Sequence, residues 1–155
     1  MDTIIKKKET FCILGLQSQI NQGSETSELF ARIWKQFESY GKIIESMSIE
    51  KQYFGIQFPT GKEEVIEYMA GMMVAKDSTV PDGLVKRVVL GSEYAAFECP
   101  VERIGECYQY IFKKWLPSAQ VLFNSKNPVF EQYPEKNSTG PVCVHIPVIK
   151  YEKID

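Results

Sequence analysis

The chain has 155 residues, enough to bury the core of one domain, and its 44% hydrophobic and 25% charged residues are ordinary for a globular protein. A net charge of −2 argues against a direct nucleic-acid partner. No segment approaches the ~20 apolar residues of a membrane-spanning helix. The basic N-terminus lacks the apolar stretch of a signal peptide, so we expect a cytoplasmic protein that does not contact a membrane.

The first half of the chain contains the pattern of a strand, a helix and two more strands. Residues 9–19 are a run of apolar and small residues that is typical of a strand. Apolar side chains recur at helical spacing over residues 26–40, and we expect Gly41 to end this helix. Two strands follow, near residues 52–58 and 64–76, joined by a turn that contains proline and glycine.

The same order returns in the second half, after a loop rich in turn residues. Residues 85–98 are expected to contain a strand. A helix begins at Pro100 and ends at Pro117. Two further strands are predicted near residues 129–133 and 142–149.

The two halves also agree in detail, since residues 31–37 of the first helix align with residues 109–115 of the second. A repeated order of elements indicates an internal duplication. We therefore predict one α+β domain over residues 1–155, built as a tandem duplication of a β-α-β-β module of the SHS2-like type. The modules cover about residues 8–76 and 84–150, and a pseudo-twofold axis relates them around a central cleft, where pockets tend to lie.

Common catalytic and metal-binding motifs are absent from the sequence. The four cysteines form no CxxC pair and His145 is the single histidine, so we expect no metal and no cofactor. The cysteines are interpreted as buried thiols in a reducing compartment. The chain also lacks a Gly-x-Ser-x-Gly motif, a cysteine beside a plausible histidine, and a glycine-rich phosphate loop.

Glu131 and Tyr133 are the most informative candidates for a site. In a strand they share one face, roughly 7 Å apart. A carboxylate in an aromatic cleft is costly unless a cation, a proton or hydrogen-bond donors compensate it, and rings with one carboxylate suit a lipophilic cation. The alternative is that Glu131 is a solvated strand residue. Other ring candidates, for each of which core packing is the competing interpretation, are Tyr68, Tyr94, Trp115, Trp34, Tyr108 and Tyr110.

Several segments together resemble the gyrase-inhibitor-like family, also called the bacterial transcription-activator effector-binding domain. They are Tyr68–Gly71, Val80–Leu84, Ser92–Glu98, Tyr108–Pro117, Phe130–Tyr133 and Val144–Val148. The resemblance covers essentially the whole chain and implies two β-α-β-β modules around a cleft. It also implies that Glu131 is the acidic residue of the ligand site, with Tyr68, Tyr94, Trp115 and Tyr133 as aromatic candidates around it.

The resemblance leaves three functions open. We favour a standalone module that binds aromatic, cationic small molecules as a sensor or sequestering protein in regulation or stress resistance. In the family this domain is often fused to a helix-turn-helix domain of the AraC or MerR type, for which the two modules leave no room. The second is a hydrolase of cyclopropane-bearing genotoxins, in which Glu131 and Trp115 would act. The third is a module that binds a protein such as DNA gyrase or a regulator.

Overall fold

The computed structural model describes residues 3–22, 26–134 and 140–151. Within them, nine strands form one antiparallel sheet, and two helical segments cover it. The strands are β1 (Thr3–Lys8), β2 (Phe11–Asn21), β3 (Ser48–Pro59), β4 (Val65–Val74), β5 (Val85–Val89), β6 (Ser92–Pro100), β7 (Val121–Phe123), β8 (Val129–Tyr133) and β9 (Pro141–Lys150). The helical segments are α1 (Thr26–Met47) and a second segment made of a 3₁₀ turn (Val101–Arg103), α2 (Ile104–Tyr110), a π-helical turn (Ile111–Trp115) and α3 (Leu116–Ser118).

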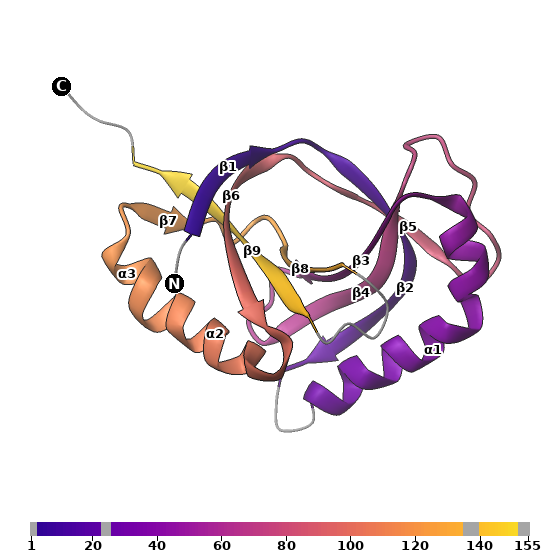
Figure 1. Ribbon diagram of the computed structural model, residues 1–155, viewed down its shortest axis with the longest axis horizontal. Helices are drawn as coiled ribbons and strands as arrows, with labels where there is room; N and C mark the ends of the chain where they lie inside the picture. The colour runs from indigo at the N-terminus through magenta and orange to yellow at the C-terminus, as the bar shows by residue number, and fades with distance from the viewer. Residues whose placement is uncertain (1–2, 23–25, 135–139, 152–155) are drawn as a thin grey trace.

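The strands lie in the order β1-β6-β9-β8-β3-β4-β2-β5, and β7 pairs with β9. The pair β8–β3 joins the two halves of the chain at the centre of the sheet. β1, at the start of the first half, pairs with β6 of the second, and β5, at the start of the second half, pairs with β2 of the first. Figure 1 shows a strongly curved sheet with both helical segments on its outer side.

Buried side chains form three clusters, because alternate residues of each strand face opposite sides of the sheet. One cluster packs α1 onto the first-half strands and includes Phe37 and Ile44. A second packs α2 onto β6 and β9 and includes Phe97 and Ile111. The third includes Phe130 and fills the inward face of the curved sheet. Each such large apolar side chain contributes roughly 1.5–3 kcal/mol when fully buried.

Several elements differ from the sequence prediction. β1 and β7 were not predicted, and residues 85–98 form two strands, β5 and β6, instead of one. α1 continues through Gly41 to Met47, because Ile44 extends its buried stripe and this packing outweighs the roughly 1 kcal/mol cost of a helical glycine. Pro100 is the last residue of β6, so the helical segment begins one residue later than predicted.

Two expectations about the cysteines are wrong. Cys99 and Cys107 form a disulfide, because the end of β6 and the buried face of α2 bring their Cα atoms to 6.2 Å. Cys143 lies beside His145, with 3.7 Å between Sγ and Nε2, because residues i and i+2 of a strand share a face. Burial lowers the pKa of His145 to about 3, so its ring is neutral, and it stacks on Phe130 at 4.3 Å.

Two kinds of feature are absent from the described residues. No group of three or more histidine, cysteine, aspartate or glutamate side chains could hold a metal ion in the described ranges. No helix in that part of the chain has the length and apolar character to cross a membrane.

Candidate functional site

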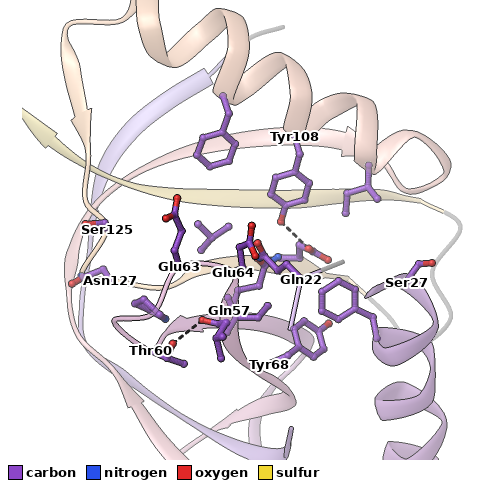
Figure 2. A pocket seen from close by; sticks show the side chains of 18 of the residues that line it. Gln22, Ser27, Gln57, Thr60, Glu63, Glu64, Tyr68, Tyr108, Ser125 and Asn127 are labelled. Carbon is purple, nitrogen blue, oxygen red and sulfur yellow. Dashed lines mark hydrogen bonds between the residues drawn. The ribbon is translucent and has the colours of Figure 1, made fainter. Parts of the chain in front are cut away.

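A cleft of about 1160 Å³ lies between the two helical segments, over the centre of the sheet. Its volume slightly exceeds the ~300–1,000 Å³ that is usual for small-molecule sites. α1 contributes Phe30 and Trp34 to one wall, and α2 contributes Tyr108 to the other. Figure 2 shows Tyr108 pointing from its helix toward the sheet, where Gln57 and Tyr68 form part of the floor.

Helical and strand periodicity explain why these side chains converge. Phe30 and Trp34 are four residues apart on α1 and therefore share one face of that helix. Ile104 and Tyr108 have the same spacing on α2, and both line the cleft. Glu131 and Tyr133 are two residues apart on β8. Their side chains therefore point to the same side of the sheet, toward the helices.

Glu131 is the central polar group of the cleft and is only 8% exposed. The Tyr108 hydroxyl donates a hydrogen bond of 2.7 Å to its Oε2, and the Tyr133 hydroxyl donates to its Oε1. The polar side chain of Gln57, which also lines the cleft, favours the ionised form of the carboxyl and so lowers its pKa. Glu131 lies opposite Gly55 in the register with β3, at the junction of the two halves. The carboxyl is therefore held by hydrogen bonds from α2 and from its own strand.

Burial raises the pKa of Glu131, since a charged carboxylate loses its hydration there. The hydrogen bonds from Tyr133 and Tyr108 and the polar side chain of Gln57 act in the opposite direction, because they stabilise the ionised form. The pKa values of both tyrosines are raised above the usual value, first by burial and next by the charge of Glu131. Both phenols consequently stay protonated at neutral pH and act as neutral donors.

Aromatic side chains surround this carboxyl. The Trp34 indole Nε1 donates a hydrogen bond of 2.8 Å to the Tyr68 hydroxyl, and the Phe30 ring lies 4.5 Å from the Tyr68 ring. The Trp34 and Tyr133 rings meet edge to face at 5.8 Å. Tyr68 fits here because Gly55 has no side chain: a Cβ at that position would lie 2.3 Å from the Tyr68 hydroxyl oxygen.

The structure brings three of the five predicted site residues together. Glu131, Tyr133 and Tyr68 line the cleft. Trp115 instead packs edge to face on Phe97 at 4.9 Å. It is seven residues after Tyr108, a spacing that would place both on one face of a regular α-helix, but the π-helical turn Ile111–Trp115 shifts the register between them.

Tyr94 also lies outside the cleft lining. It is fully buried on the inward face of the sheet, and its hydroxyl donates to the Pro128 carbonyl at 3.0 Å. In β6 the neighbouring Ala95 faces the helix, so alternation directs Tyr94 to the opposite side. Neither Tyr94 nor Trp115 therefore belongs to the site that the geometry defines.

Trp34, Tyr108 and Gln57 line the cleft but were not among the five predicted site residues. Trp34 and Tyr108 were ring candidates, but nothing distinguished them from core residues. Gln57 was not considered, although a polar residue between the buried Ile56 and Phe58 of β3 is a signal that could have found it.

Comparison with known proteins identifies the family. A family model described as an integron-associated effector binding protein, Cass2, matches residues 4–148. The chain belongs to this family. Cass2 is a GyrI-like family, so the resemblance drawn from the sequence motifs is confirmed. A search of the curated proteins finds no match.

Solved structures share the fold of this Cass2 chain at low sequence identity. SAV2435 bound to tetraphenylphosphonium is 17% identical with a TM-score of 0.76, over 96% of this chain and 94% of that one. An integron cassette protein from Vibrio cholerae is 14% identical with a TM-score of 0.67, over 94% and 95%. The EcmrR C-terminal domain is 10% identical with a TM-score of 0.64, over 97% and 98%. These matches support the α+β fold.

Proposed function

We propose that this effector-binding chain takes a lipophilic aromatic cation into its cleft, with Glu131 as the counter-charge. The observation that carries the proposal is a buried carboxyl among aromatic rings that has phenol and amide donors but no cationic partner. In the described ranges no lysine, arginine or histidine forms an ion pair with Glu131; the ion pairs found there join Arg87 to Glu67 and Lys150 to Glu93. A cation in the cleft would supply the missing charge.

The surrounding rings suit such a ligand as well. The faces of tryptophan and tyrosine attract cations by about 0.5–2 kcal/mol, more when water is excluded. Trp34, Tyr108 and Tyr133 all line the cleft beside the carboxyl. SAV2435, which has the same fold, was solved with tetraphenylphosphonium, an aromatic cation of this kind. Aromatic walls and one buried carboxyl together favour bulky, weakly hydrated cations over small inorganic ones.

We further propose that the chain acts in the cytoplasm as a sensor or sequestering protein. This role fits the family description, which names effector binding. A complex of EcmrR with DNA also matches, over 97% of this chain and 58% of that one, so only part of EcmrR resembles it. The hydrolase alternative has less support, since Trp115 packs in the core. No described feature favours a gyrase partner.

We also infer that residues 8–76 and 84–150 are copies of one module related by a pseudo-twofold axis. The strand order supports this, since β2-β4-β3 and β6-β9-β8 meet at β3 and β8. The reciprocal pairing of β1 with β6 and of β5 with β2 gives the same relation at the two edges. The cleft would then lie at the junction of the copies.

Two probes of nearly equal shape and opposite charge test the proposed function. Tetraphenylphosphonium and tetraphenylborate should be titrated into the protein separately, with binding followed by calorimetry. We expect the cation to bind at least about tenfold more tightly, since the cleft holds an uncompensated carboxylate. Equal affinity for the two ions, or preference for the borate, would show that hydrophobic contact alone drives binding and would refute the charge account.

A further inference from the structure

A pair of side chains with metal-binding chemistry lies on the inward face of the sheet, on the side away from the cleft. Val144 and Ile146 of β9 pack in the cluster beneath α2, so alternation turns Cys143 and His145 to the opposite side. Cys143 is half-buried and His145 is 4% exposed. The Cys143 Sγ lies 3.7 Å from Nε2 of His145. Neither residue lines the cleft, so the pair is independent of the proposed ligand site.

The polar atoms of His145 are poorly satisfied by the protein. Within the described ranges its Nδ1 is buried and has no hydrogen-bond partner. Nε2 faces the Cys143 sulfur, and a thiol is both a weak donor and a weak acceptor. The ring is nevertheless held in place, because it stacks on Phe130 with the centroids 4.3 Å apart. An imidazole that is buried, fixed in orientation and weakly hydrogen-bonded is a candidate ligand for an ion.

The protonation states of the two side chains suit a metal that prefers sulfur. Burial, and next the positive charge of Lys8, lower the pKa of His145 to about 3, so no proton competes for its lone pair at neutral pH. Burial raises the pKa of Cys143, although the charges of Lys8 and Lys6 act in the opposite direction. The sulfur therefore keeps its proton until a metal displaces it. Thiolate and imidazole together are donors that soft metal ions prefer.

The distance between the two donor atoms allows both to bind one ion. Metal–sulfur and metal–nitrogen bonds of roughly 2.3 and 2.0 Å put the donors about 3.5 Å apart at a tetrahedral angle and about 4.3 Å apart in a line. The 3.7 Å between Sγ and Nε2 falls within this range. Among the described residues no group of three or more such ligands could hold a metal, so the protein offers this pair alone. Structural zinc requires more ligands, whereas copper(I) and silver(I) are stable at low coordination numbers.

Charge also selects a monovalent ion. A thiolate and a monovalent cation cancel, and a neutral imidazole adds no charge, so the bound group is neutral and tolerates burial. A divalent ion would leave a net positive charge that the field of Lys8 disfavours. We propose that Cys143 and His145 form a site for a soft monovalent metal ion, copper(I) or silver(I). On binding, the thiol proton leaves to water, Sγ and Nε2 each bond to the ion, and no electron is transferred.

Competition with a chromogenic copper(I) chelator tests the proposal, without oxygen, at about pH 7 and with ascorbate as reductant. We expect the wild type to bind about one equivalent of copper(I), and Cys143→Ser to bind it at least about 100-fold more weakly. His145→Phe keeps a ring on Phe130 but lacks the nitrogen, and should bind at least about tenfold more weakly. Cys12→Ala is the matched control, because Cys12 is the other free cysteine of the described residues. Its affinity should stay within about threefold of the wild type.

Four results would overturn the proposal. They are no uptake by the wild type, unchanged affinity in a folded His145→Phe, loss of binding in Cys12→Ala, and zinc(II) affinity equal to that for copper(I). X-ray absorption of the copper(I)-loaded wild type gives a second measurement that needs no variant to fold. One sulfur and at least one imidazole nitrogen on copper is the expected result. Sulfur ligands alone would show that a bare thiol takes the ion and would contradict a site shared with His145.

Discussion

Replacing Glu131 with glutamine removes the proposed counter-charge while changing the shape of the cleft very little. The carboxyl is 8% exposed and lies among rings, so bulk water screens it poorly. The amide keeps one oxygen that can accept a hydrogen bond from a tyrosine hydroxyl. The variant therefore tests the charge and not the packing of the site.

The size of the effect follows from Coulomb's law. A bulky cation whose charge centre lies roughly 5 Å from the carboxylate interacts by about 3 kcal/mol at an effective dielectric constant of about 20. Partial hydration of the cleft reduces this value, and the cation–π attraction of the rings persists in the variant. We therefore expect Glu131→Gln to lose about 1.5–3 kcal/mol of binding free energy, or roughly 10–150-fold in Kd.

Calorimetric titration of tetraphenylphosphonium into wild type and Glu131→Gln measures this loss directly. Glu98→Gln is the control, because Glu98 is an exposed carboxylate of β6 that does not line the cleft. Its affinity should stay within about twofold of the wild type. Thermal melts must show that both variants are folded. If Glu131→Gln binds tetraphenylphosphonium within about threefold of the wild type, the counter-charge reasoning is wrong.

Three further outcomes are expected. Because burial raises the pKa of Glu131, tetraphenylphosphonium affinity should fall as pH decreases through that pKa and the carboxylate is lost; calorimetry in two buffers should detect proton release there, and constant affinity between about pH 4 and 8 would contradict this. Replacing Cys99 and Cys107 with serine should lower the free energy of unfolding by about 2–4 kcal/mol in a denaturant titration, and four titratable thiols in the denatured, unreduced protein would disprove the disulfide. Gly55→Ala should displace Tyr68 and weaken binding of the same probe at least threefold, about 0.7 kcal/mol, because its Cβ would lie 2.3 Å from the phenol oxygen; unaltered affinity would show that Tyr68 does not shape the site.

Spacing along a single strand predicted that Glu131 and Tyr133 share one face. They are two residues apart in β8, and that relation depends only on the extended backbone. Apolar periodicity also predicted both helical segments and most strands, although not β1 and β7, and the family motifs then indicated the fold. The structure places both Glu131 and Tyr133 in the lining of the cleft. That these two residues bind the ligand is our proposal.

Two remaining candidates failed for different reasons. Tyr108 and Trp115 have the seven-residue spacing of one α-helical face, but the π-helical turn Ile111–Trp115 between them shifts the register, and apolar periodicity does not predict such a turn. β6 is buried on both faces, so alternation could not decide the direction of Tyr94. Gln57 reaches Glu131 through the pairing of β3 with β8, a contact between distant parts of the chain.

The structure of the protein crystallised with tetraphenylphosphonium tests the central claim most directly. Our account predicts that the phosphorus lies in the cleft between α1 and α2, with Glu131 as the nearest anionic group. At least two of the rings of Trp34, Tyr108 and Tyr133 should lie within about 6 Å of the cation, the range of cation–π contacts. A cation bound outside this cleft, or inside it with another carboxylate nearer than Glu131, would contradict the account.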